Sequence, residues 1–257
     1  MLKIKDISYR VKDKILLDSI SASFEPGKIS GIIGSNGAGK STLLKIISGE
    51  IQSTTGKIYL DNNQLRDYYS TFPATMRAVV SQHEALNTDI TVTEYILLGR
   101  LIHTMGRYQV SDYQSVERAL QFTGCLEFAH KDLLSLSGGE RQRIQLARAL
   151  VQIEKDPYVY RGYLFLDEFS ANMDIYYQQQ MLKLLKKLCN TNQLAIIIIA
   201  HDLNQIINYF DYCILLKEGK LIMFGTPSQV LTTDNIELAY KIKSSQIRIN
   251  DRYYFIH

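Results

Sequence analysis

The sequence lacks the features that mark several classes of protein. Its three cysteines, Cys125, Cys189 and Cys213, lie far apart and form no Cys-x-x-Cys pair, which argues against a disulfide framework or a zinc ribbon and favours a reducing compartment. The longest apolar run extends only from Leu194 to Ala200, whereas a membrane-spanning helix needs about twenty apolar residues. The first ten residues are too polar for a secretory signal, so we expect none.

An excess of charge of one sign is also missing. The net charge is only +3, and Lys and Arg form no long block, whereas a dedicated nucleic-acid binder usually has a stronger, clustered basic excess. The mild charge decides little by itself, and we expect no nucleic acid among the partners. Hydrophobic residues make up 46% of the chain and charged residues 21%, which is the balance of a globular protein with a sizeable core. We find no low-complexity linker and no internal repeat. We therefore expect residues 1–257 to form a single domain.

Several apolar runs have the length of buried strands, and each ends in a polar cluster. These runs are Ile29–Gly34, Tyr163–Leu166 and Leu194–Ala200. Runs that are apolar on both faces are typical of parallel strands covered by helices. Because ligands bind at the carboxyl ends of such strands, we expect the polar clusters to form one site.

Two other patterns complete the predicted α/β fold, whose sheet is mainly parallel. Alternating polar and apolar residues in Leu2–Lys5, Ser21–Phe24 and Gly56–Leu60 predict an N-terminal antiparallel β subdomain. Helical spacing predicts an inserted α-helical subdomain at about residues 84–151. A short C-terminal extension, about residues 236–257, is expected to contain a strand pair, and the sequence suggests no function for it.

The first polar cluster is a phosphate-binding loop. Residues Gly34-Ser35-Asn36-Gly37-Ala38-Gly39-Lys40-Ser41 match G-x-x-x-x-G-K-[ST], after an apolar strand and before a helix. The glycines allow backbone N–H groups to turn toward phosphate oxygens, Lys40 can reach the β- and γ-phosphates, and Ser41 can ligate Mg²⁺. The helix that continues from Thr42 points its positive end at the anion. No Asn-Lys-x-Asp element for guanine is present, so we expect ATP rather than GTP.

The other two clusters carry groups that suit ATP hydrolysis. Asp167 ends an apolar strand and is placed to hold Mg²⁺ through water, as a Walker-B aspartate does. Glu168 follows it and is the natural general base for the attacking water. His201 follows the third apolar run, where it could hydrogen-bond the γ-phosphate.

Leu136-Ser137-Gly138-Gly139-Glu140 resembles the signature sequence of ABC ATPases, with Glu140 where Gln is commoner. Ser137 is expected to cap a helix whose first amides form a second anion site. The resemblance implies a P-loop NTPase (RecA-like) core and ATP hydrolysis. It also implies that two copies pack head to tail, so that Ser137 and Gly139 contact the γ-phosphate held by the other copy.

Further residues match the family in the expected order. Tyr9 matches the aromatic residue that stacks on adenine, although a tyrosine on a strand face remains the alternative. Gln82 matches the glutamine that senses Mg²⁺ and the γ-phosphate, and Asp174 matches the D-loop aspartate. Phe169 and Ala171 replace a Pro and a Ser that are common between Walker B and the D-loop, so the conformation there is harder to predict.

The residue pattern and the resemblance together assign three sets of residues. Glu168, His201, Gln82 and Lys40 are expected to act in catalysis, and Ser41, Gln82 and Asp167 to bind Mg²⁺. The residues expected to bind ATP are Tyr9, Gly34, Ser35, Asn36, Gly37, Ala38, Gly39, Lys40, Ser41, Thr42, Ser137, Gly138, Gly139, Glu140 and Asp174.

More narrowly, the chain resembles the ATPases of bacterial metal-chelate importers. Val80-Ser81-Gln82-His83 and Thr91–Arg100 carry this resemblance. Gln152–Arg161 is similar to an insertion found in haem importers, with a variable surface loop that has no bearing on the substrate as the alternative. Haem is thus the expected cargo, with ferric siderophore and cobalamin as alternatives. The implied partners are two transmembrane permease subunits and, indirectly, a periplasmic or lipoprotein binding protein, at the cytoplasmic face of the inner membrane. A soluble ABC ATPase of iron–sulfur cluster assembly is the alternative from another class.

Overall fold

The computed structural model describes residues 1–65, 72–81, 89–104, 106–169, 173–191, 193–243, 245–249 and 252–256. These residues form two compact units, one comprising Met1–Phe72 with Ala195–His257 and the other Pro73–Leu194. Gln82, residues 84–88 of the predicted helical subdomain, and Ala171 in the D-loop lie outside the described residues. No helix in the described ranges is long and apolar enough to cross a membrane.

The first unit begins with the predicted antiparallel strands. β1 (Leu2–Val11) pairs with β2 (Lys14–Phe24) and with β4 (Thr55–Leu60), and β4 pairs with β5 (Asn63–Gln64). At the start of β1 the buried residues Leu2 and Ile4 alternate with exposed lysines, because one face of the strand packs on the core.

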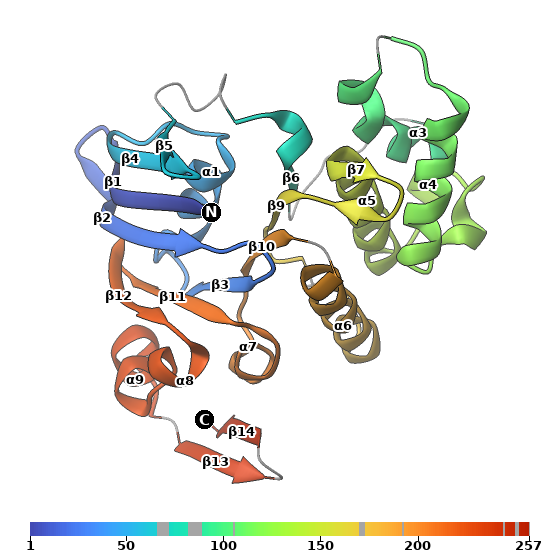
Figure 1. Cartoon of the computed structure of the whole chain (residues 1–257). Helices are drawn as coiled ribbons and strands as arrows, with labels where there is room; N and C mark the ends of the chain where they lie inside the picture. The colour runs from blue at the N-terminus through green and yellow to red at the C-terminus, as the bar shows by residue number, and fades with distance from the viewer. Residues whose placement is uncertain are drawn as a thin grey trace. The chain divides into compact units, whose positions relative to one another are not determined.

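The parallel strands of the first unit follow (Figure 1). β3 (Ile29–Gly34) lies between β10 (Leu194–Ile199) and β11 (Tyr212–Lys217), parallel to both, and β12 (Lys220–Gly225) pairs antiparallel with β11. Every residue of β3 and β10 is buried, which explains why these runs are apolar on both faces. The strands predicted from the first and third apolar runs are thus confirmed.

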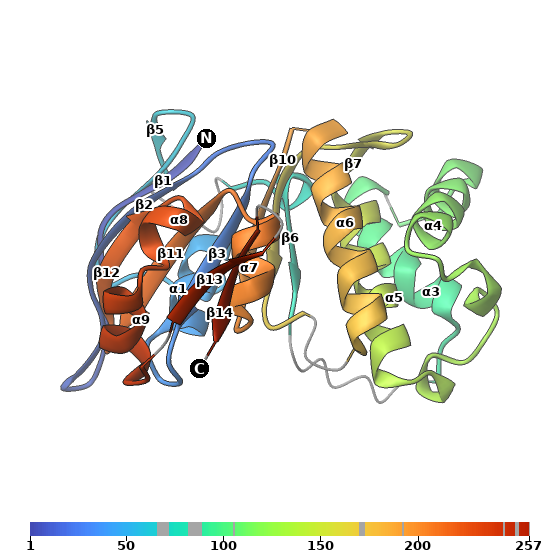
Figure 2. The same ribbon diagram turned by 90° about the horizontal axis from the view of Figure 1, so that it is seen from below.

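Helices and a C-terminal hairpin complete the first unit. The helices are α1 (Lys40–Ser48), α7 (Leu203–Tyr209), α8 (Pro227–Val230) and α9 (Thr233–Tyr240). The predicted strand pair of the tail is present as β13 (Ser245–Ile249) and β14 (Arg252–Ile256). Figure 2 shows this hairpin beside α7, where the Phe255 amide donates to Asn204 Oδ1 at 2.8 Å.

The second unit contains its own parallel strand pair. β6 (Arg77–Val80) pairs with β9 (Gly162–Leu166), with Val80 opposite Leu166, which confirms the strand predicted from the second apolar run. The short helix η1 (Ala74–Met76) precedes β6, and the long helix α6 (Ile175–Thr191) follows β9. Both strands end level with each other, so the residues after Leu166 and after Val80 lie at one edge.

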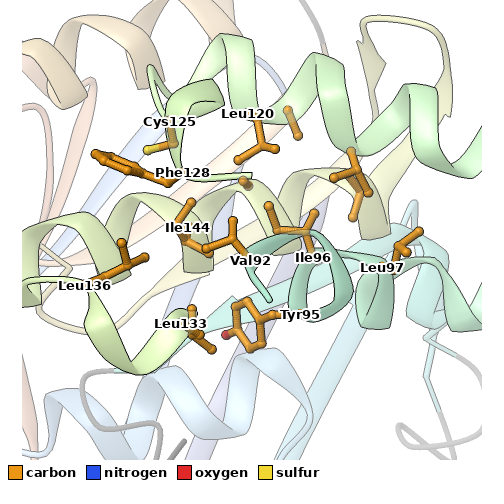
Figure 3. Close-up of a cluster of buried hydrophobic side chains, with 14 residues drawn as sticks. Val92, Tyr95, Ile96, Leu97, Leu120, Cys125, Phe128, Leu133, Leu136 and Ile144 are labelled. Atoms are coloured by element: carbon orange, nitrogen blue, oxygen red, sulfur yellow. The ribbon is translucent and has the colours of Figure 1, made fainter. Parts of the chain in front are cut away.

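Helices occupy most of the rest of this unit (Figure 1). They are α3 (Val92–Leu97), η2 (Leu98–His103), α4 (Val110–Phe122), η3 (Leu126–Phe128), η4 (Leu133–Ser135) and α5 (Gly138–Ile153). All of these helices except η2 contribute apolar side chains to one core cluster, which includes Val92, Ile96, Leu120 and Ile144 (Figure 3). Burying each such side chain stabilises the fold by about 1.5–3 kcal/mol. Capping boxes at Thr91 and Ser137 define where α3 and α5 begin.

The segment that resembles an insertion forms a small hairpin after α5. β7 (Glu154–Asp156) pairs with β8 (Val159–Tyr160). The buried Glu154 carboxylate anchors the hairpin: it accepts hydrogen bonds from Arg118 Nε and Nη2, both at 3.0 Å, and from the Tyr158 amide at 3.2 Å. Ser115 also donates to it. The hairpin is therefore fixed to α4 rather than projecting freely.

Candidate functional site

The phosphate-binding loop joins the end of β3 to α1 in the first unit. Gly34 has φ +145°, and a Cβ there would lie 2.2 Å from the Leu216 carbonyl oxygen. Gly39 has φ +100° and packs closely against Leu16 and Leu17 of β2. Both positions require glycine for two reasons. The positive φ values disfavour residues with a Cβ, and neighbouring atoms occupy the space that a Cβ would need. This explains why the loop begins and ends with glycine.

The N-terminal end of α1 is suited to bind an anion. Its N-cap residue is Gly39, which makes no side-chain cap hydrogen bond, and the first turn of α1 contains no acidic residue. The first amides of a helix carry partial positive charge and need acceptors. A polyphosphate on this loop would supply them, so the residues present suit the triphosphate of ATP.

Lys40 is held beside the loop, with a side chain that is only 6% exposed. Its Nζ donates to the carbonyl oxygens of Gly34 at 2.9 Å and of Ser35 at 3.1 Å. The ammonium group of Lys40 therefore already contacts the backbone of the loop. A bound phosphate would replace these carbonyl groups as the partner of Lys40 with a short movement of the side chain.

His201 and Tyr9 lie in the same unit as the loop. β10 runs parallel to β3 with Ile199 opposite Ile32, so His201, two residues further on, lies level with Gly34 at the carboxyl edge. Tyr9 is half-buried on β1 opposite Leu17, the residue of β2 that contacts Gly39. Both positions are compatible with the predicted contacts to the γ-phosphate and to adenine.

The acidic pair lies in the second unit at the end of β9. The Asp167 amide donates to the Val80 carbonyl oxygen at 2.9 Å, so Asp167 still continues the strand pairing. Glu168 then takes a left-handed conformation with φ +48°. Adjacent residues of a strand point to opposite faces, and this turn ends that alternation immediately after Asp167. Gln82, which the sequence places at the end of the neighbouring β6, lies outside the described residues.

The signature residues form the start of α5. Ser137 Oγ and the Ser137 amide both donate to Glu140 Oε2 at 2.7 Å, and the Glu140 amide donates back to Ser137 Oγ at 3.4 Å. The predicted N-cap is confirmed. Hydrogen bonds from the Ser137 hydroxyl and amide hold the pKa of Glu140 below its usual value, so the carboxylate stays ionised near neutral pH.

The N-terminal ends of α1 and α5, the two helices expected to bind phosphate, therefore differ. The first turn of α1 has no acidic residue, whereas the first turn of α5 contains the carboxylate of Glu140. For Ser137 to donate to a phosphate, its hydroxyl must turn away from Glu140. If a phosphate binds at the start of α5, Glu140 would therefore influence that binding as well as the helix cap.

Asp174 has a structural contact that the sequence comparison with the family did not indicate. Its Oδ1 accepts a hydrogen bond from the Tyr177 amide at 3.0 Å, in the manner of an N-cap residue of α6. Phe169, which stands where Pro is common, is buried. Residues 170–172 between them lie outside the described part of the chain.

One residue of the site was missed in the sequence. The Gly34 amide donates to the hydroxyl of Tyr240 at 2.9 Å, across a separation of 206 residues. Tyr240 is the last residue of α9, in the tail for which the sequence suggested no function. No local pattern distinguishes it from the other tyrosines, of which the chain has 17 in all.

Comparison with known proteins agrees with this description. The model of the ABC transporter family matches residues 17–169. The chain is 36% identical over 248 residues to the hemin import ATP-binding protein HmuV of Gloeobacter violaceus, covering 96% of this chain and 90% of that protein.

Two solved structures share the fold. One is described as a metal-chelate type ABC transporter in an inward-facing conformation, with a TM-score of 0.81, 24% identity, and coverage of 99% of this chain and 95% of the other. The other is the dimeric structure of MJ0796, a bacterial ABC transporter cassette, with a TM-score of 0.77, 25% identity, and coverage of 88% and 99%.

The fold and the phosphate-binding loop define a P-loop nucleoside triphosphatase. The chain belongs to the ABC transporter family, as one of the ATP-binding subunits that hydrolyse ATP to power transport. Cassettes of this family form dimers and work with transmembrane subunits.

Proposed function

We propose that this chain is the ATP-hydrolysing subunit of a bacterial ABC importer for haemin. The observation that carries the proposal is the similarity, over nearly the whole chain, to a hemin import ATP-binding protein. The anchored hairpin β7–β8, in the segment that resembles an insertion of haem importers, agrees with it. The partners are then two permease subunits and, through them, a haemin-binding protein. The chain itself would lie at the cytoplasmic face of the membrane.

ATP binding would use the first unit. Adenine stacks on Tyr9, the phosphates lie on the loop amides from Ser35 to Ser41, and Lys40 exchanges its carbonyl partners for phosphate oxygens. The uncapped start of α1 supports the negative charge. Ser41, Asp167 and Gln82 would hold Mg²⁺, which neutralises charge on the phosphates when it is bound.

Hydrolysis would need a second copy of the chain. Ser137 and the amides of Gly138 and Gly139 on one copy approach the γ-phosphate on the other, and Asp174 lies at the same contact. The presence in each chain of two separate helix N-termini of the expected kind, at α1 and α5, supports this arrangement. When Ser137 turns from Glu140 to the phosphate, the two copies close around two ATP molecules.

The chemical step is assigned to Glu168. Its carboxylate accepts a proton from water as the water attacks the γ-phosphate in line with the leaving oxygen. Lys40, His201 and the opposite Ser137 donate hydrogen bonds to the oxygens on which negative charge accumulates. Release of phosphate then allows the dimer to open, and the change is passed to the permease.

The test is ATP hydrolysis by this subunit assembled with its permease in liposomes. We expect stimulation by a binding protein loaded with haemin and none by the empty protein or by one loaded with a ferric siderophore. Stimulation by the siderophore-loaded protein alone would refute haemin as the cargo. Rapid basal hydrolysis without a stable permease complex would instead favour a soluble ATPase of iron–sulfur cluster assembly. A Glu168→Gln subunit in the same liposomes shows whether the measured hydrolysis comes from this chain.

A further inference from the structure

Helix α9 carries a tyrosine to the back of the phosphate-binding loop. The helix contacts β11, and its residues Ile236 and Ala239 are buried. It ends at Tyr240, and Lys241 takes a left-handed conformation, φ +60°, with its amide donating to the Glu237 carbonyl oxygen. The position of Tyr240 is therefore fixed by the packed helix before it and the turn after it.

The hydroxyl of Tyr240 is suited to accept a hydrogen bond from the loop. The Gly34 amide donates to it at 2.9 Å, and Gly34 itself is buried. Burial raises the pKa of Tyr240 to about 12, so the hydroxyl is neutral at every pH at which the protein works. A buried N–H group without an acceptor is costly, which makes this contact necessary for the observed loop conformation.

Gly34 is held at three points. Its amide donates to Tyr240, its carbonyl oxygen accepts from Lys40 Nζ at 2.9 Å, and its α-carbon packs against the Leu216 carbonyl group. When Lys40 turns to a phosphate, it leaves the Gly34 carbonyl oxygen. The hydrogen bond to Tyr240 involves the other side of the residue and does not depend on Lys40.

We propose that Tyr240 is a positioning residue for ATP binding: its hydroxyl fixes the first peptide of the phosphate-binding loop, so that the following amides face the phosphates. This inference rests on the proposed ATP-binding function. It also gives the C-terminal part of the chain a role in the site. Any displacement of α9 would move Tyr240 and so alter its hydrogen bond to the Gly34 amide.

The test compares Tyr240→Phe with the wild-type chain, since this change removes the hydroxyl and keeps the ring. Tyr212→Phe is the matched control, because Tyr212 is half-buried on β11 and its ring packs against Phe224 with centroids 5.9 Å apart. Binding of Mg-ADP is measured by calorimetry, KM and kcat for ATP by phosphate release, and the melting temperature without nucleotide.

Loss of one hydrogen bond to a buried amide should weaken Mg-ADP binding in Tyr240→Phe by about tenfold. KM for ATP should rise with it, and kcat should stay near the wild-type value. The melting temperature should fall below that of Tyr212→Phe by about 2–4 °C per kcal/mol lost, because the buried Gly34 amide is left without its acceptor, so binding is measured at a temperature where both variants are folded. Hydrogen exchange at the Gly34 amide should become faster in Tyr240→Phe only.

Mg-ADP affinity equal in the two variants would overturn the proposal. So would a fall in affinity that disappears at a lower temperature where Tyr240→Phe is fully folded, because that result assigns Tyr240 to stability alone. A wild-type chain that binds no nucleotide would instead refute the proposed function, so the two failures are distinguishable.

Discussion

The buried carboxylate of Glu154 should be essential for the stability of the second unit, Pro73–Leu194. Replacement of Glu154 by Ala removes the group that accepts from Arg118, from Ser115 and from the Tyr158 amide. Removing one partner of a buried ion pair costs about 3–5 kcal/mol, because the other charge is left without compensation. The Arg118 side chain keeps 16% of its surface exposed, against 3% for Glu154. We therefore expect the lower end of that range, about 3 kcal/mol.

Urea denaturation followed by far-ultraviolet circular dichroism measures this loss, since the chain has no tryptophan to report by fluorescence. A loss of about 3 kcal/mol corresponds to a fall in melting temperature of about 6–12 °C for a protein of this size. Asp18→Ala is the control, because Asp18 and Lys220 form an exposed pair at 3.8 Å. Its free energy of unfolding should change by less than about 1 kcal/mol.

The effect of pH supplies a second check on the same variant. Burial on its own would raise the pKa of Glu154, but hydrogen bonds from Arg118 and Ser115 hold it below the usual value. A carboxylate with a lowered pKa stabilises the folded state above its ordinary pKa and loses that contribution as the pH falls through the folded value. The difference between wild type and Glu154→Ala should thus be full at neutral pH and shrink below about pH 4. A difference that is small at pH 7, or that does not change with acid, would refute this account.

Three further predictions concern the site. Glu168→Gln should lower ATP hydrolysis by about a hundredfold or more while ATP-bound dimers accumulate in size-exclusion chromatography, and unchanged turnover would remove Glu168 from the base role. Gly34→Ala should weaken ATP binding about tenfold or more, because the added Cβ would clash with the Leu216 carbonyl oxygen and distort the loop. A distortion that costs about 1.4 kcal/mol is enough for a tenfold loss of affinity. Gly106→Ala, at φ +88° with open space around it, should leave calorimetric ATP binding unchanged, and equal losses in both variants would contradict this reasoning. Glu140→Gln keeps the helix cap but removes a negative charge beside an anion site, so half-maximal dimerisation should need about two- to fivefold less ATP. An unchanged ATP requirement would show that the charge of Glu140 does not oppose closure.

Local patterns were sufficient to predict the strands and motifs that carry the site. Ile29–Gly34 and the run from Leu194 were predicted as strands because parallel strands buried on both faces need continuous apolar residues. The N-cap at Ser137 was predicted because a cap depends on residues three apart in sequence.

Long-range contacts could not be predicted in this way. The hydrogen bond between Gly34 and Tyr240 depends on how α9 packs against β11, which no local pattern encodes. The burial of Glu154 could not be predicted either, because a glutamate is ordinarily exposed. Its burial is explained by its pairing with Arg118 on α4, which is distant in sequence. The cap bond of Asp174 was missed because a D-loop assignment rests on likeness to a family and not on hydrogen bonding.

The central claim, that each ATP is enclosed by the phosphate-binding loop of one copy and the signature of another, is tested most directly by Ser137→Arg. In a Glu168→Gln chain, which hydrolyses too slowly to reopen, we expect ATP to produce a dimer. Adding Ser137→Arg should abolish that dimer while the monomer binds ATP with unchanged affinity. Ser111→Arg, an exposed site near the start of α4, is the control and should still dimerise. Loss of ATP binding to the Ser137→Arg monomer would show that the signature acts within its own chain and would contradict the account.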